Sequence, residues 1–169
     1  MSAPPLPPLP VDSTSFRQAL AQFASGVTVV TTRDAAGGTL GLTVSAFCSV
    51  SLSPPLVLVS LDAGSEAHRG FRDSGLFGVS ILAEGQDDVS RLFARPGREK
   101  FLELPLTTGP RGLALVPGAL AHIECEVRAA HPAGDHVIYI GEIVSLAVRS
   151  GRPLLYNRGG YRRLADDAQ

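Results

Sequence analysis

Val27-Thr-Val-Val-Thr-Thr32 is the stretch of this sequence that decides its fold class. Its β-branched residues favour an extended strand. Asp34-Ala-Ala-Gly-Gly38 follows as a turn, and a second strand is predicted from Thr39 toward Val50. Two strands joined by a short turn predict a β-hairpin as the first unit of the fold.

Further short strands follow this hairpin at close spacing. Ser53-Pro-Pro55 separates them from it, because two prolines cannot lie inside a central strand. We predict strands over residues 56–61, 77–82, 119–129 and 136–148, with Gly134-Asp135 as the turn between the last two, whereas residues 105–117 give no clear assignment. The sequence does not indicate a Rossmann sheet, because it has neither strand–helix–strand alternation nor a Gly-x-Gly-x-x-Gly motif. The pattern predicts a closed or partly closed antiparallel barrel.

A few short helices accompany the strands. The first begins near Ser13, where Ser15 and Gln18 are predicted to form a capping box and Gly26 to end the helix. Its apolar positions recur at the spacing of one helical face: Phe16, Ala19, Leu20 and Phe23. Two more helices are predicted, over residues 66–73 and in the segment that ends before Pro96.

Length and composition indicate one globular domain. The chain has 169 residues, 44% of them hydrophobic and 18% charged, with a formal net charge of −1. This balance argues against a general binder of nucleic acids or anionic membranes. We predict a flexible, proline-rich arm over residues 1–12 and a single domain over residues 13–165. Without a signal peptide or an apolar run of about 20 residues, the protein is expected in the cytoplasm.

The cysteines and histidines suggest no disulfide framework and no metal. Cys48 and Cys125 lie among apolar or small residues, where buried free thiols are the commoner case. His68, His122 and His131 lack the spacing of metal ligands. The sequence also lacks the Gly-x-Ser-x-Gly motif that would indicate a serine nucleophile.

Three segments carry residues that suit a ligand. Residues 41–56 combine small residues and hydroxyls beside apolar strands, so a backbone there can approach a flat ring; a hairpin strand with a polar outer face is the alternative. His136 opens a strand beside a turn, either as a ligand-facing residue or as an ordinary surface or core histidine. Residues 153–163 gather tyrosines and arginines, which suit planar rings and phosphates or a basic strand that closes the barrel.

Two further features are weaker. Ser65 precedes a predicted helix, where free N–H groups favour a phosphate, although an ordinary N-cap explains it equally well. Lys100 and Phe101 follow Arg98, and this charge either approaches a phosphate or forms a solvated basic turn.

Taken in order, these segments resemble the flavin reductase family of two-component monooxygenases. The resemblance covers nearly all of the chain after residue 12 and rests on residues 16–30, 41–55, 74–82, 134–136 and 153–156. It implies an antiparallel split β-barrel, of the Greek-key, FMN-binding type. It also implies a homodimer that uses FMN or FAD with NADH or NADPH and releases reduced flavin to a separate oxygenase.

The resemblance further implies roles for residues in this chain. His136 would meet the nicotinamide and orient it for hydride transfer from C4 to flavin N5. The isoalloxazine ring would be bordered by Thr43, Val44, Ser45, Ala46 and Ser49, and the ribityl chain and phosphate by Ser60, Leu61, Ser65, Lys100 and Phe101. The nicotinamide side would include Tyr156, Asn157, Arg158 and Gly159, where this sequence departs from the commonest family pattern.

Two other functions fit a split barrel. One is a flavin-dependent oxidase of the pyridoxamine-phosphate oxidase type, which would hold FMN tightly and bind a substrate phosphate. The other is a flavin- or haem-binding module without catalysis. Fold alone does not separate these functions.

Overall fold

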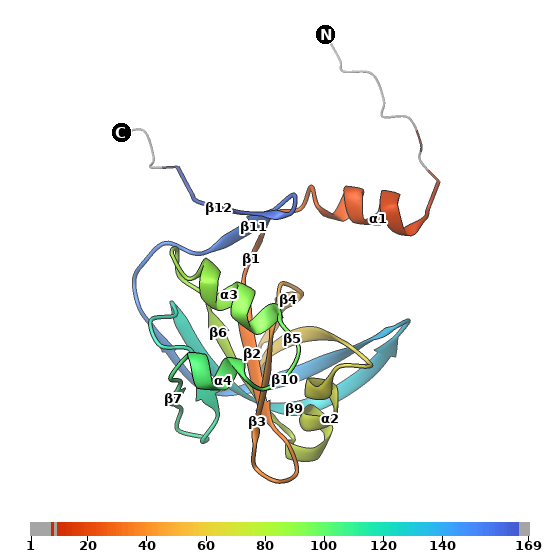
Figure 1. Ribbon diagram of the computed structural model, residues 1–169. Coiled ribbons are helices and arrows are strands. Elements are labelled where there is room, and N and C mark those ends of the chain that lie inside the picture. Colours follow the sequence, from red (N-terminus) through yellow and green to blue (C-terminus); the bar gives the residue numbers. More distant parts are fainter. Residues whose placement is uncertain (1–7, 9, 166–169) are drawn as a thin grey trace.

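One antiparallel sheet of seven strands forms the body of the protein. The computed structural model describes residue 8 and residues 10–165, so most of the predicted N-terminal arm lies outside the described residues. The strand order is β3-β2-β6-β9-β10-β5-β4, and the sheet curls into a barrel (Figure 1). The strands are β2 (Thr28–Arg33), β3 (Thr39–Val44), β4 (Phe47–Leu52), β5 (Pro55–Asp62), β6 (Leu76–Ile81), β9 (Ala121–Ala133) and β10 (His136–Val148). The predicted antiparallel split barrel is confirmed.

The barrel is split where the chain passes from β3 to β4. These strands lie at opposite edges of the sheet, yet only Ser45 and Ala46 separate them in sequence. The predicted single strand from Thr39 toward Val50 is therefore wrong. Its first half pairs with β2 and its second half with β5, so the chain changes partners at Ser45 and Ala46. We call this segment, residues 43–47, the seam.

The barrel core is packed around aromatic rings. Phe71 stacks on Phe77 with ring centroids 4.8 Å apart, and it also contacts the fully buried ring of Tyr139. Phe71 belongs to α2 (Glu66–Ser74), which covers this end of the barrel and ends at Gly75 in a left-handed conformation. Gly141 lies within β10, and this position requires glycine because a Cβ there would overlap the ring of Phe77.

A second apolar cluster packs outside the barrel under α3 (Asp87–Ala94). Phe93, Leu82 and Val116 are fully buried in it. The segment after α3, which sequence did not assign, contains α4 (Lys100–Glu103), β7 (Thr107–Thr108) and β8 (Ala114–Leu115). Its loop is held by the buried Glu124, whose carboxylate accepts backbone N–H bonds from Arg111 and Leu113.

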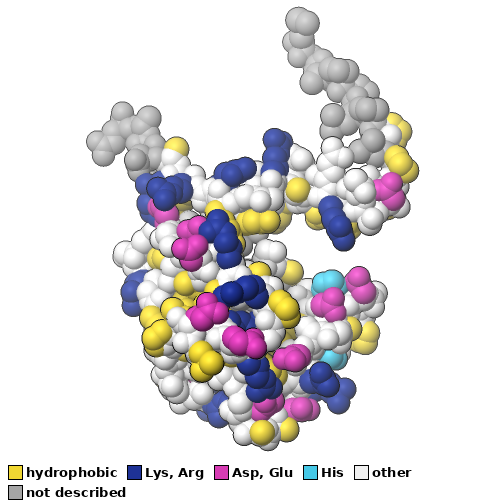
Figure 2. All heavy atoms as spheres, viewed as in Figure 1, with side chains coloured by type: hydrophobic (Ala, Val, Ile, Leu, Met, Phe, Trp, Pro, Cys, Tyr) yellow, Lys and Arg dark blue, Asp and Glu magenta, His cyan; other side chains and the backbone are white. Residues whose placement is uncertain are grey.

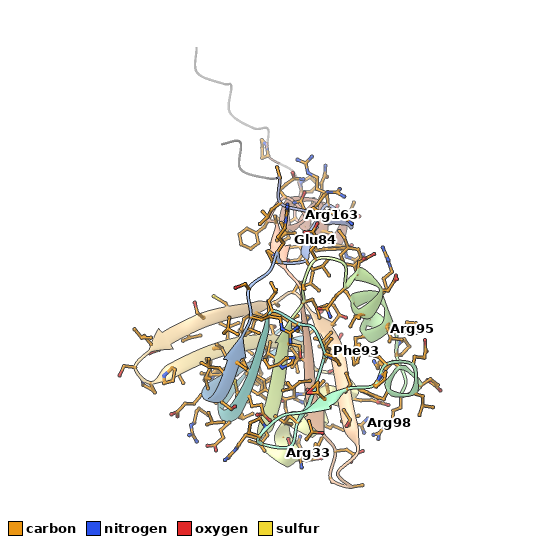
Figure 3. The ribbon with its side chains drawn as sticks, turned by 90° about the vertical axis from the view of Figure 1, so that its left-hand side faces the viewer. Arg33, Glu84, Phe93, Arg95, Arg98 and Arg163 are labelled. Carbon is orange, nitrogen blue, oxygen red and sulfur yellow. The ribbon has the colours of Figure 1, made fainter. Side chains whose placement is uncertain are left out.

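The two chain ends form a separate layer above the barrel, which we call the roof. It consists of α1 (Ser13–Leu20), β1 (Ser25–Gly26), β11 (Leu155–Asn157) and β12 (Gly160–Arg162). The three strands form one sheet with β11 in the middle (Figure 1). At the base of the roof, Arg163 and Arg152 pair with Glu84 at 3.1 and 3.0 Å, and Figure 3 shows Glu84 and Arg163 together at this junction.

Helix α1 begins where predicted but is capped and ended differently. Asp12 is the N-cap, and its carboxylate accepts from the backbone of Thr14 and Ser15, so the predicted pairing of Ser15 with Gln18 is wrong. The helix ends at Leu20, and Gly26 lies in β1 instead of stopping the helix. The predicted apolar face is largely exposed, with Phe16, Leu20 and Phe23 at 59, 54 and 77%.

Both cysteines are free thiols, but only one is buried. Cys125 is fully buried, and burial raises its pKa to about 12. Cys48 is exposed on β4, so the expectation that both thiols are buried is wrong for this residue. Cys48 lies on the edge strand of the sheet, next to the seam.

No helix among the described residues is both long enough and apolar enough to cross a membrane.

Candidate functional site

Three cavities lie in a row along the seam, and neighbouring cavities share lining residues. The first, the α2 cavity, has a volume of about 460 Å³. The second, the tyrosine cavity, has about 220 Å³ and shares Thr43 and Ala94 with the first. The third, the roof cavity, has about 420 Å³ and shares Ser45 and Tyr156 with the second. Together they form an elongated site of the size that small-molecule ligands occupy.

The α2 cavity combines an apolar floor with positive charge. Its walls are β3, the N-terminus of α2 and the segment from Phe93 to Phe101. Arg95 and Arg98 line it but are held by carboxylates, Arg95 by Glu103 at 2.9 Å and Arg98 by Asp34 at 2.7 Å. Figure 3 shows both arginines on the same side of the molecule, with Phe93 nearer to the barrel.

Lys100 is the cation of this cavity that forms no ion pair with a carboxylate of the described residues. It is the only lysine in the chain, and 7% of it is exposed. Its ammonium group donates to the carbonyl oxygen of Arg95 at 2.6 Å and lies 5.8 Å from the ring centroid of Phe93. Desolvation lowers the pKa of Lys100, and Glu66 acts in the opposite direction. Lys100 lies on α4, so the alternative of a solvated basic turn is wrong.

Ser65 lies at the opposite wall of the same cavity. Its side chain caps α2 by accepting from the backbone N–H of His68 at 3.2 Å, as the N-cap interpretation predicted. The cavity thus faces the N-terminus of a helix on one side and a buried ammonium group on the other. Both features favour an anion such as a phosphate.

The tyrosine cavity is the narrow middle of the site. Thr43 and Ser45 form one wall, and Tyr156 and Tyr161 of the roof form the other. The tyrosine rings meet edge to face, with centroids 5.4 Å apart. Apolar ring faces opposite small hydroxyl residues suit a flat heteroaromatic ring.

The roof cavity lies between the barrel and the roof. Leu20 and Phe23 line it from above, and Phe47, Cys48 and Leu58 from below. Figure 2 shows the deep gap between roof and barrel, open at the right of the view. Within the roof, two contacts join the segment after α1 to the β11–β12 turn: the amide of Asn157 donates to the carbonyl oxygen of Ala21 at 3.0 Å, and the side chain of Arg158 donates to that of Gln22.

The structure brings together most of the residues that the resemblance implied. Two kinds of residue stand apart. The side chains of Val44 and Leu61 are buried in the core, so only their backbone can reach a ligand, and Ser49 and Ser60 lie on the strands beyond the seam. The cavities are lined by Thr43, Ser45, Ala46, Ser65, Lys100, Phe101, Tyr156, Asn157, Arg158 and Gly159.

His136 is not among the residues that line these three cavities. It opens β10 opposite Asp62, with its Nδ1 2.7 Å from the carboxylate of Asp135. The hydrogen bond from His136 lowers the pKa of Asp135, which is therefore ionised at neutral pH. Because a carboxylate only accepts, Nδ1 carries the proton and Nε2 stays available.

Sequence reasoning missed Ser90 and Ala94, which line the tyrosine cavity, and it included Tyr161 in the segment 153–163 without assigning it to the site. Ser90 and Ala94 come from α3, and no sequence pattern shows that α3 lies beside β3. Tyr161 had a usable signal. The turn Arg158-Gly159 has positive φ at both residues, and such a turn places Tyr156 and Tyr161 opposite each other.

The protein is therefore a split antiparallel barrel with a row of cavities along its seam and a buried cation at one end of the row. Comparison with known proteins supports this class and narrows it. Residues 20–165 match the family described as the flavin reductase like domain, and the chain belongs to this family.

Relatives agree with this assignment over most of their length. The chain is 43% identical to the FMN reductase (NADH) SmoA of Agrobacterium fabrum, over 91% of this chain and 87% of that protein. It is 37% identical to the reductase subunit HsaB of a flavin-dependent monooxygenase from Rhodococcus jostii, over 93% of this chain and 80% of that protein. A solved structure also matches: the NADH:FAD oxidoreductase SgcE6 of Streptomyces globisporus, in complex with NAD and FAD fragments. It superimposes with a TM-score of 0.89 at 34% identity, over 94% of this chain and 96% of that chain.

Proposed function

We propose that this chain is an NADH-dependent flavin reductase that takes FMN or FAD as its flavin and supplies the reduced flavin to a separate oxygenase. The observation that carries the proposal is the row of three cavities along the seam, which offers a ring-sized space in its middle and a buried ammonium group at one end. Relatives that are named as NADH-dependent reductases and as a monooxygenase reductase subunit support it.

The described residues fit a flavin in shape and in charge. Small residues at the seam, Ser45 and Ala46, let the backbone approach a flat ring closely. Ser65 at the α2 N-terminus and Lys100 face the α2 cavity, where a phosphate would gain charge-assisted hydrogen bonds. The apolar floor from Leu42 and Phe93 suits the rest of the ligand.

In this proposal the chain contributes binding and orientation. A bound flavin and nicotinamide supply the chemistry, a hydride transfer from nicotinamide C4 to flavin N5. Tyr156 and the turn at Arg158 and Gly159 hold the nicotinamide from the roof side. His136 orients it through Nε2, since Asp135 fixes the proton on Nδ1. Backbone N–H groups near Ser45 stabilise negative charge that develops on the ring.

We further propose a cytoplasmic homodimer. The support is apolar surface that a monomer leaves open: Phe16 on α1, Phe23 just after it, and Leu146 and Val148 on β10 are 59, 77, 62 and 74% exposed. Apolar side chains that are exposed in a monomer are often covered at a subunit interface. Sedimentation equilibrium of the full chain tests this, and a monomer at micromolar concentration would contradict it.

The deciding experiment for the activity follows oxidation of NADH and NADPH at 340 nm with added FMN, FAD or riboflavin. We expect turnover with NADH that saturates as free flavin increases. Flavin binding without nicotinamide oxidation would contradict the proposal. In that case reduction by pyridoxamine phosphate would identify an oxidase, and no reduction by either donor would indicate a binding module.

A further inference from the structure

We infer that Tyr161 is a positioning residue, which fixes the ring of Tyr156 and thereby sets how well the enzyme binds NADH. The inference rests on the proposed function, because it takes Tyr156 as part of the nicotinamide side. Tyr156 and Tyr161 are cross-strand partners in β11 and β12. Their rings lie 5.4 Å apart at an angle of 65°, which is an edge-to-face contact.

Tyr161 is held from two sides by α3. Its hydroxyl donates to the side-chain oxygen of Ser90 at 2.8 Å, and Ser90 is only 2% exposed. The guanidinium carbon of Arg91 lies 4.9 Å from the centre of the Tyr161 ring. Arg91 is itself paired with Asp87 at 2.7 Å and with Asp88 at 3.0 Å. The ring of Tyr161 therefore has one fixed orientation.

Tyr156 has no such support of its own. Its ring is 39% exposed, and its hydroxyl has no hydrogen-bond partner among the residues that the structure describes. What holds the ring is the backbone pairing of Tyr156 with Ser25 and the edge contact with Tyr161. Loss of the anchor at Tyr161 would thus release the ring of Tyr156, which lines both the tyrosine cavity and the roof cavity.

Ser90 connects this pair to the opposite wall of the cavity. Its carbonyl oxygen accepts from the hydroxyl of Thr43 at 2.6 Å, while its side chain accepts from Tyr161. The connected residues Thr43, Ser90 and Tyr161 therefore span the tyrosine cavity and set the distance between seam and roof.

The test uses three variants of the full-length protein that lack the hydrogen bond between Tyr161 and Ser90. Tyr161→Phe removes the donor hydroxyl, Ser90→Ala removes the acceptor hydroxyl, and the double variant removes both. We expect each single variant to raise KM for NADH about three- to tenfold, with kcat and the Kd of flavin changed less than about twofold. The double variant should be no worse than the more impaired single variant, because both substitutions remove the same bond.

Tyr139→Phe is the matched control. It also removes a hydroxyl bond to a helix, the 2.6 Å contact with Nδ1 of His68, but on the α2 side of the barrel. This variant should lose stability without a change in KM for NADH. If Tyr161→Phe behaves in the same way, or if it weakens flavin binding as much as NADH binding, the inference is wrong.

Two further outcomes keep the inference separate from the proposed function. A wild-type protein that does not oxidise NADH in the presence of flavin overturns the proposed function. A wild-type protein that is active, with a KM for NADH unaffected by the substitutions, overturns the inference alone. If Tyr161→Phe does not fold, Ser90→Ala keeps both tyrosine rings and decides the question.

Discussion

The hydroxyl of Thr43 donates a 2.6 Å hydrogen bond to the carbonyl oxygen of Ser90, and this bond ties strand β3 to helix α3 at the seam of the barrel. The two residues are 47 positions apart in sequence. Their contact forms the common wall of the α2 cavity and the tyrosine cavity, because Thr43 lines both. Several expected properties of the protein depend on the contacts around this wall.

Thr43→Val should weaken both the fold and flavin binding. The substitution keeps the shape of the side chain and removes the bond to Ser90, which costs about 1 kcal/mol of unfolding free energy. If the same bond holds the seam in place for the ring, the Kd of FMN should rise about fivefold, the equivalent of about 1 kcal/mol. Urea unfolding and quenching of flavin fluorescence measure the two effects.

The control is Thr32→Val. Thr32 is buried on β2, away from the three cavities; its hydroxyl donates to the carbonyl oxygen of Leu76 at 2.7 Å and lies 2.9 Å from the hydroxyl of Ser74. The substitution should lower stability by at least as much as Thr43→Val and leave the Kd of FMN unchanged. Equal effects of both variants on FMN binding would show that the Thr43 bond has no special part in the site.

Lys100→Met should weaken the binding of flavins that carry a phosphate and leave the binding of riboflavin unchanged. A hydrogen bond to a charged group contributes about 1.5–3 kcal/mol, so loss of the ammonium group should weaken FMN binding at least about tenfold. Riboflavin, which has no phosphate, should bind equally well to both proteins. Titration calorimetry with the two ligands makes the comparison, and an equal loss for both would contradict a phosphate contact.

The pH dependence of FMN binding should follow from the same residue. Because desolvation lowers the pKa of Lys100 below its ordinary 10.5, the ammonium group loses its proton at a lower pH than a surface lysine would. FMN affinity, measured relative to riboflavin, should thus be constant at neutral pH and fall as the pH rises through this lowered pKa. The Lys100→Met protein should lack this fall, and its persistence there would assign the effect to another group.

The two cysteines should differ sharply in reactivity. With a pKa of about 12, about one in ten thousand Cys125 thiols is ionised at pH 8, and the side chain is fully buried. We expect a disulfide reagent to modify only Cys48 in the native protein and both thiols after unfolding. NADH bound together with FMN should slow the reaction of Cys48, since this residue lines the roof cavity. Rapid modification of two thiols in the native state would contradict the assignment.

His136→Ala should impair nicotinamide use while flavin binding stays nearly intact. Nicotinamide use should fall because the proposed contact is made by Nε2 of this residue. Flavin binding should stay intact because His136, at the start of β10, lines none of the three cavities. We expect KM for NADH to rise about tenfold, the loss of about one hydrogen bond to a polar ligand. His131→Ala, on the exposed end of the neighbouring strand β9, is the matched control and should change neither parameter. An equal loss of flavin affinity in His136→Ala would remove the residue from the nicotinamide side.

Local signals in the sequence predicted most of the fold. The β-branched run at residues 27–32, the break at Ser53-Pro-Pro55 and the turn at Gly134-Asp135 each act within a few residues, and the strands they bound are present. The same local reasoning failed at Thr39–Val50. Nothing in that run shows that its halves pair with different strands, because the exchange at Ser45 and Ala46 is a consequence of barrel curvature.

The site divides along the same line. Sequence alone determined the barrel class, the small and hydroxyl residues at the seam and the tyrosines near the C-terminus. Only the tertiary structure decided that Lys100 is buried, that Cys48 is exposed and that α3 brings Ser90 between Thr43 and Tyr161. The physical reason is that burial and contacts between distant residues depend on how the elements pack, whereas strand and turn formation depend mainly on neighbouring residues.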